Sequence, residues 1–249
     1  MGKQVRSLCL GLLLVFLTAA AVGVEGLKIW PMPKSVSHGA QTLYLGKDFG
    51  LRTEGSKYID ASGILKDGFS RLLDVVEAAH VIDSNSNHSD LSTMLQGLNV
   101  IILLPNDELQ YGIDESYKLS IPTNENPVYA HLEAQTVYGA LHGLQPLVYV
   151  EKQRDDCVAD TSRHYQPLPM IKNVIDAMAY TKLNVLHWHI VDSQSFPLEI
   201  PSYPNLWDGA YSLSERYTMA DAAEIVNYAQ RRGINVLAEI DVPGHALSW

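Results

Sequence analysis

Two apolar segments of nearly the same sequence each lead into a carboxylate. Leu-Asn-Val-Leu at residues 183–186 recurs as Ile-Asn-Val-Leu at residues 234–237, an offset of 235 − 184 = 51 residues. Asp192 follows the first segment, Asp241 follows the second, and residues 218–230 between them have a helical pattern. This strand–helix–strand repeat predicts a β/α barrel, in which polar residues at the carboxyl ends of the strands carry the chemistry.

The second half of the chain contains the elements that such a barrel requires. Apolar residues at helical spacing predict a helix over residues 167–180, and strands are expected at residues 183–190 and 234–240. Thr218 and Asp221 have the spacing of a capping box, so the helix between these strands is expected to begin there.

The first half, residues 27–149, has the pattern of a separate α+β unit. Helical periodicity, apolar runs and turn residues separate its expected elements. These are a helix at residues 59–80, a strand at 98–104, a strand pair at 117–121 and 128–133, and a second helix at about 134–144.

The N-terminus has the order of a secretory signal peptide. Lys3 and Arg6 precede an apolar run at residues 8–16, which small residues follow, so residues 1–24 are expected to be removed. The run is shorter than a membrane span, and no span is expected after cleavage. Asn87 lies in an Asn-His-Ser glycosylation sequon, which agrees with secretion. The net charge of −10 argues against a nucleic-acid partner.

His187 and His189 share one face of the first strand, which raises a metal site with His245 as an alternative. A third close ligand is missing from the pattern, so we expect packed, hydrogen-bonded histidines, no metal and no cofactor. Asp192 and Asp241 also have a structural interpretation, as caps of the turns that follow them.

Several longer blocks extend these motifs. They are residues 27–33 with Trp-Pro-Met-Pro, 160–165 (Asp-Thr-Ser-Arg-His-Tyr), 183–192, 196–199 (Phe-Pro-Leu-Glu) and 238–249. In these blocks the chain resembles the β-N-acetylhexosaminidases of glycoside hydrolase family 20, and the plant members best. The resemblance implies an N-terminal α+β accessory domain at 27–149, followed at 157–249 by the first part of a (β/α)8 barrel, which is incomplete.

The resemblance also implies a function. Members of this family remove terminal N-acetylhexosamine from glycans, and the acetamido group of the substrate acts as the nucleophile. Asp192 and His245 match positions that form a hydrogen-bonded relay toward the general acid, and Asp241 matches a carboxylate of the same pocket. These three are the candidate catalytic-site residues, in supporting roles. A secreted or vacuolar location, glycan substrates and a homodimer are the corresponding expectations.

Other residues near the strand ends have less specific roles. We expect Arg163 and His164 to brace the barrel mouth and Trp188 to be a core residue. Trp207 and Trp249 are each compatible with the core or with a platform for a sugar ring.

The chain departs from the family pattern in two places. The family's catalytic Asp–Glu pair follows barrel strands beyond the third, which is where this sequence stops. The family's substrate-gripping arginine would fall at Asp155, with Arg154 one residue out of register, and residues 156–159 replace the first strand. We therefore expect this chain alone to be inactive. The alternative is a non-catalytic paralogue that binds sugar or regulates an intact subunit.

Overall fold

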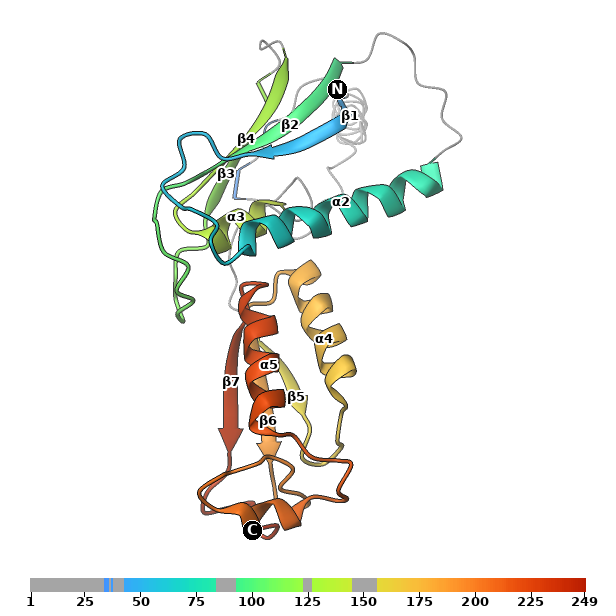
Figure 1. The fold of residues 1–249 in the computed structure, drawn as a ribbon, viewed down its shortest axis with the longest axis vertical. Coiled ribbons are helices and arrows are strands. Elements are labelled where there is room, and N and C mark those ends of the chain that lie inside the picture. The colour runs from blue at the N-terminus through green and yellow to red at the C-terminus, as the bar shows by residue number, and fades with distance from the viewer. Residues whose placement is uncertain (1–33, 36, 38–42, 84–92, 123–126, 145–155) are drawn as a thin grey trace, which may run out of the picture. The chain divides into compact units, whose positions relative to one another are not determined.

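A computed structural model describes residues 34–35, 37, 43–83, 93–122, 127–144 and 156–249 (Figure 1). The expected signal peptide, the sequon at Asn87 and the irregular stretch at 145–155 lie outside the described residues. The described strands form two separate sheets, each with its own apolar core.

The first sheet has four strands in the order β1-β2-β4-β3. Its elements are β1 (Leu43–Arg52), α2 (Ile64–Asp83), β2 (Thr93–Ile102), β3 (Tyr117–Ser120), β4 (Val128–Ala134) and α3 (Val137–Leu144). β1, β2 and β4 are parallel, whereas β3 is antiparallel to β4. The expected strand pair is therefore β3 and β4.

The helix expected at residues 59–80 begins later, at Ile64. Gly63 has a φ of +73°, a conformation that interrupts a right-handed helix. The carboxylate of Asp60 accepts the backbone N–H groups of Leu65 (3.0 Å) and Lys66 (2.9 Å), so it caps the first turn from outside the helix.

The second sheet consists of three parallel strands in the order β5-β6-β7. They are β5 (Asp156–Asp160), β6 (Val185–Val191) and β7 (Asn235–Ile240), alternating with α4 (Leu168–Thr181) and α5 (Met219–Gln230). Residues 156–159, expected as a replacement for the first barrel strand, do form a strand beside β6. The arrangement is the start of a β/α barrel.

Both helices cover the same face of this sheet (Figure 1). Leu186, Trp188 and Ile190 of β6 project toward that face and pack with Ile175 of α4 and Ile225 of α5. Trp188 is therefore a core residue, as expected. The alternate residues of β6, among them His187 and His189, project from the opposite face, which in a closed barrel is the interior.

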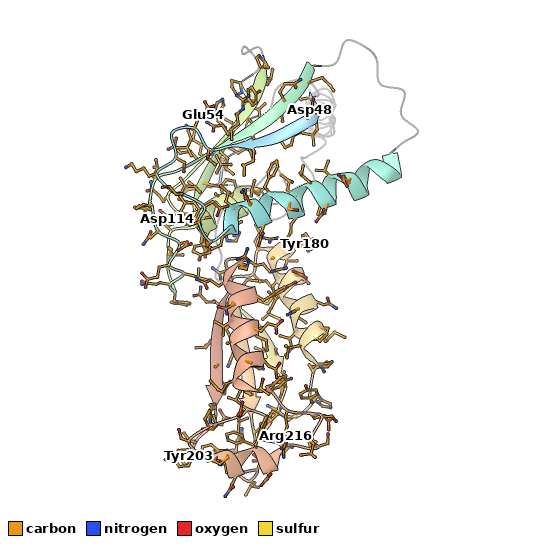
Figure 2. The ribbon with its side chains drawn as sticks, in the orientation of Figure 1. Asp48, Glu54, Asp114, Tyr180, Tyr203 and Arg216 are labelled. Carbon is orange, nitrogen blue, oxygen red and sulfur yellow. The ribbon has the colours of Figure 1, made fainter. Side chains whose placement is uncertain are left out.

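The capping box expected at the start of α5 is present. Asp221 donates its backbone N–H to Thr218 Oγ1 (3.1 Å), and the Asp221 carboxylate accepts the backbone N–H of Thr218 (2.8 Å). This reciprocal pair fixes the end of the long connection from β6. That connection contains a short 3₁₀ helix, η1 (Pro204–Gly209), together with Tyr203 and Arg216, which are labelled in Figure 2.

In the part of the chain that the structure describes, no helix is both long and apolar enough to cross a bilayer.

Candidate functional site

The interior face of the three-stranded sheet changes character along its length. In the strand register, Val158, His187 and Leu237 lie side by side, and the next row on that face holds Asp160, His189 and Glu239. Asp192 and Asp241 follow where β6 and β7 end. Carboxylates from three strands therefore gather at the carboxyl edge of the sheet, where barrel enzymes build their sites.

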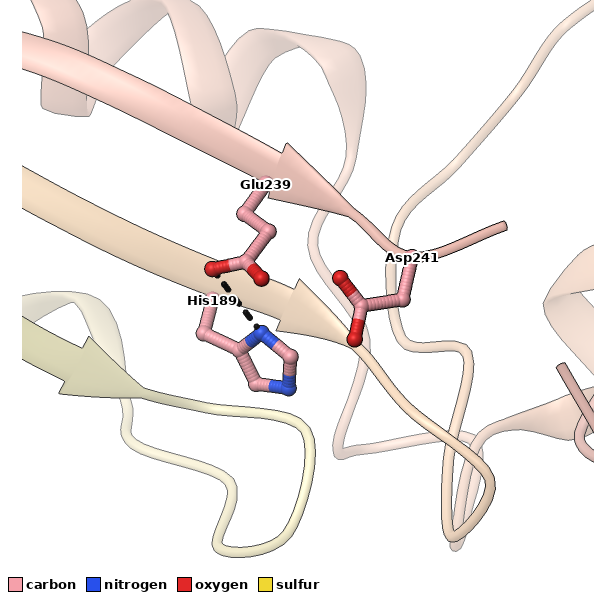
Figure 3. Close-up of side chains that lie close together, drawn as sticks. All are labelled: His189, Glu239 and Asp241. Atoms are coloured by element: carbon pink, nitrogen blue, oxygen red, sulfur yellow. Dashed lines mark ion pairs between the residues drawn. The ribbon is translucent and has the colours of Figure 1, made fainter. Parts of the chain in front are cut away.

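Glu239 lies between the two histidines of β6. Its Oε2 is 3.2 Å from His189 Nδ1, and it also contacts His187 Nε2 (Figure 3). The expectation that His187 and His189 are packed and hydrogen-bonded agrees with these contacts. His189 is 5% exposed, so its charge state depends on the carboxylates around it.

Asp192 is the most heavily contacted carboxylate of the site. Its Oδ1 accepts the backbone N–H of Ser193 (2.6 Å), and its Oδ2 lies 3.1 Å from His189 Nε2 and 3.2 Å from Arg163 Nε. Only 4% of the residue is exposed. Its backbone carbonyl accepts the hydroxyl of Ser248 (2.6 Å), which ties the end of β6 to the segment that follows β7.

The hydrogen bond expected between Asp192 and His245 is replaced by another. His245 Nδ1 lies 2.7 Å from Asp241 Oδ2 and 3.6 Å from Asp192 Oδ2, so its hydrogen bond goes to Asp241 and the contact with Asp192 is an ion-pair distance. The reason is local. His245 has a φ of +58° and turns its ring back onto the carboxylate four residues earlier.

Burial and hydrogen bonding act in opposite directions on the acid–base groups. Burial works against the ionised form of Asp192, but the Ser193 N–H, His189, His245 and Arg163 outweigh it and lower the pKa of the carboxyl. Burial likewise opposes the charged form of His189, and its bonds to Asp192 and Glu239 prevail and raise its pKa. Hydrogen bonds with Glu239 and His245 lower the pKa of Asp241.

The remaining candidates divide between the site and its surroundings. Arg163 bridges Asp160 (2.9 Å) and Asp192, which joins the loops after β5 and β6. His164 is exposed. Trp207 donates to the carbonyl of Pro197 (2.8 Å) and lies under the guanidinium of Arg216.

Trp249 is 48% exposed and contacts Phe196 edge-on, so one of its ring faces is not covered by that contact. It therefore stays compatible with the sugar-platform interpretation.

One group of described residues has the composition of a metal site. His189, Glu239 and Asp241 each offer one ligand atom, and these atoms lie within 4.8 Å of one another (Figure 3). This set differs from the three histidines considered from the sequence. In the structure these atoms already take part in hydrogen bonds and ion pairs.

Sequence reasoning did not identify Glu239 as a site residue, because the repeat suggests the wrong neighbour. Aligning the repeats at an offset of 51 places His189 opposite Ile240. The observed register pairs Val185 with Asn235, an offset of 235 − 185 = 50, which places His189 opposite Glu239. A signal was available, since Glu239 and Asp241 alternate along β7 and share a face.

Chemically, the site combines four carboxylates (Asp160, Asp192, Glu239 and Asp241) with one arginine and three histidines. Such a set can accept hydrogen bonds from sugar hydroxyls and can hold or pass protons near neutral pH, because imidazole titrates there. Its members sit on strand ends and short turns, so their relative positions are fixed by the sheet.

Comparisons with known proteins agree over both halves of the chain. Residues 29–148 match the family model described as beta-acetyl hexosaminidase like, and residues 156–249 match the model described as glycosyl hydrolase family 20, catalytic domain. Among curated proteins, beta-hexosaminidase 3 of Arabidopsis thaliana is 61% identical, covering 91% of this chain and 47% of the relative. Beta-hexosaminidase 1 of the same plant is 42% identical, covering 89% and 46%. The chain thus spans about half the length of these relatives.

Solved structures show the same fold. The chain superposes on a chitobiase from Flavobacterium johnsoniae with a TM-score of 0.66 and 29% identity, covering 88% of this chain and 35% of that one. An N-acetyl-beta-hexosaminidase from Streptomyces plicatus, in complex with Thio-NAglucal, gives a TM-score of 0.63 at 24% identity, covering 87% and 46%, and supports the fold alone.

Proposed function

The chain belongs to glycosyl hydrolase family 20, and on that premise we propose that it is part of a glycosidase that removes terminal N-acetylhexosamine residues from glycans. The observation that carries the proposal is the meeting of Asp192, Asp241 and His245 at the carboxyl edge of three parallel barrel strands. The names of the most similar curated proteins, all beta-hexosaminidases, support the same substrate class.

In the proposed reaction, the 2-acetamido oxygen of the substrate attacks the anomeric carbon while a general acid protonates the leaving oxygen. Asp192, Asp241 and His245 act as supporting residues. The carboxylates orient the imidazole of His245, and the imidazole sets the proton affinity of the acid. The acid and the carboxylate that orients the acetamide come, in this proposal, from barrel strands after the third.

The experiment uses a chimera as well as the chain itself. Residues 156–249 replace the equivalent segment of Arabidopsis beta-hexosaminidase 3, and turnover of p-nitrophenyl N-acetylglucosaminide is measured. We expect the chimera to be active and the chain alone to show no turnover. Asp192→Asn or His245→Gln in the chimera should lower kcat by about a hundredfold or more, in the range for general acid–base groups.

The matched control is Asp208→Asn, because the side chain of Asp208 is 81% exposed and lies in η1. An active chimera that tolerates Asp192→Asn and His245→Gln as well as it tolerates Asp208→Asn would refute the supporting role. Turnover by the chain alone within about tenfold of the chimera would show that it contains an acid of its own, since general acid catalysis contributes more than that. Sugar binding without turnover would instead favour the non-catalytic paralogue.

We further propose a division into a signal peptide at 1–24, an accessory domain at 27–149 and a barrel segment at 157–249. Separate sheets with separate cores support the last two, and so do the bounds of the two family models. The charged, apolar and small residues at the N-terminus support entry into the secretory pathway. Mass spectrometry of secreted material tests this, with removal of Met1 and a glycan on Asn87 as the expected results.

A further inference from the structure

His189 is a buried histidine with a carboxylate at each ring nitrogen. Nδ1 lies 3.2 Å from Glu239 Oε2, and Nε2 lies 3.1 Å from Asp192 Oδ2. The two partners come from different segments, since Glu239 belongs to β7 and Asp192 follows β6 (Figure 3). The ring therefore links two strand ends of the site.

The two contacts restrict the protonation state of the ring. A neutral imidazole has one N–H donor and one acceptor nitrogen, whereas an ionised carboxylate only accepts. Only the imidazolium can donate to both partners at once. The alternative places a proton on Glu239, which would then donate to a neutral ring.

The surroundings of His189 are predominantly acidic. Asp160 on β5, Asp192 after β6, and Glu239 and Asp241 on and after β7 all face this region, with Arg163 as the fixed cation. His187 and His245 are the other titratable groups, and they contact Glu239 and Asp241 respectively. Four carboxylates against one arginine favour a positive charge on the buried ring.

Of the three cationic side chains around Asp192 Oδ2, His189 is the one shielded from solvent. Its side chain is 7% exposed, compared with 50% for Arg163 and 61% for His245. Solvent screens and mobilises the two exposed partners, so their hold on the carboxylate is weaker.

We propose that His189 is a permanently charged positioning residue, an imidazolium clamped between Glu239 and Asp192 that fixes the orientation and ionisation of Asp192. The inference deepens the proposed function, because Asp192 would serve the acid only if its carboxylate stays charged and in place. His245, 3.6 Å away, then meets a fixed anion at the rim.

The test is nuclear magnetic resonance on the whole chain with ¹⁵N-labelled histidine, followed from pH 5 to pH 9. His189→Gln assigns the signal, and the same chain in urea gives the unfolded reference. At pH 7 we expect both ring nitrogens of His189 to show the protonated pattern. Asp192→Asn and Glu239→Gln should each move its titration midpoint to lower pH, while Asp208→Asn should leave it unchanged.

A second readout follows the carboxyl carbon of Asp192. In His189→Gln the titration midpoint of Asp192 should move to higher pH, because the buried cation is lost. Circular dichroism checks that each variant is folded, and Glu239→Gln provides an independent perturbation if His189→Gln does not fold. A neutral tautomer of His189 at pH 7, or an Asp192 midpoint that ignores His189→Gln, overturns the proposal.

Zinc tests the competing use of the same side chains. If His189, Glu239 and Asp241 form a cation site, micromolar Zn²⁺ should shift the nitrogen signal of His189 to the metal-bound range, and a chelator should reverse the shift. That result also overturns the proposal, whereas unchanged signals support it. None of these readouts needs turnover, so an inactive chimera would count against the proposed function alone.

Discussion

Strand β4 of the first sheet and strand β6 of the second occupy comparable positions but are built differently. β4 alternates, with Val128, Ala130 and Leu132 buried and the residues between them half-buried or exposed. β6 is buried at every position except His187. One of its faces packs on helices, and the other carries His189 among carboxylates.

The difference shows two ways of burying a central strand. The first sheet has an apolar core on one side and needs only that face to be hydrophobic. β6 lies between two partners and is covered on both faces, so its interior face holds polar groups that satisfy one another. We therefore expect apolar packing to dominate the stability of the first sheet, and charge state to contribute to that of the second.

The largest effect is expected from Leu132→Ala in β4. Leu132 is fully buried in the first core, and removing a buried leucine side chain costs about 2–5 kcal/mol. Urea unfolding measures the loss, which should be the same at pH 5 and pH 8. Ile59→Ala is the control, because Ile59 is 83% exposed. A loss for Leu132→Ala no larger than the control would contradict the proposed role of packing.

The next effect concerns His189→Gln, which removes the charged hydrogen bonds of the second sheet. We expect a loss of about 1.5–3 kcal/mol at pH 5, the range for hydrogen bonds to charged groups. Hydrogen exchange of the β6 amides, corrected for intrinsic rates, measures it. The β4 amides are the internal control and should be unaffected.

The sign of the pH dependence follows from the two pKa shifts. The pKa of Asp192 is lowered, so its contribution is present above its ordinary value of 3.8 and is lost as the pH falls through the folded value. The pKa of His189 is raised, so its contribution is complete below 6.5 and is lost as the pH rises through the folded value. Protection of β6 should therefore be greatest between these limits. A flat profile in the unmodified chain would remove the distinction between the sheets.

A smaller effect is expected at the start of α5. Thr218→Ala removes the capping oxygen and should cost about 1 kcal/mol, whereas Thr218→Ser keeps the hydroxyl and should cost much less. Thermal unfolding compares the two variants, with exposed Ser202→Ala as the control. Equal losses for alanine and serine at position 218 would show that the cap does not stabilise the helix.

The smallest effect is expected from Lys172→Gln, which removes the ion pair between α4 and Glu224 of α5. The Glu224 side chain is 52% exposed, so the pair should contribute less than about 1 kcal/mol. Raising the salt concentration should reduce that difference further. A larger, salt-independent loss would mean that polar contacts on the helix side also distinguish the second sheet.

The sequence predicted the elements whose boundaries depend on local chemistry. The helix expected at 167–180 is α4, and the Thr218–Asp221 spacing located the start of α5 correctly. The site could be placed at the carboxyl ends of the strands because β/α repeats always align those ends.

Features that depend on pairing could not be predicted in the same way. β1 was missed because two glycines and a charged pair at residues 46–50 interrupt its apolar alternation, and its register with β2 shifts at that place. The partner of His245 could not be predicted either. It depends on the backbone conformation of His245, and no residue type other than glycine announces a positive φ.

The one-residue difference between the sequence repeat and the observed register has a consequence for folding. If β7 slipped by one residue, the two similar segments would align, Ile240 would face His189, and Glu239 would turn toward α5. Both carriers of charge would then be buried without partners, at a cost that apolar matching alone would not impose. The acidic cluster therefore acts as proofreading during assembly, since it penalises a mispaired sheet that the duplicated apolar sequence would otherwise permit.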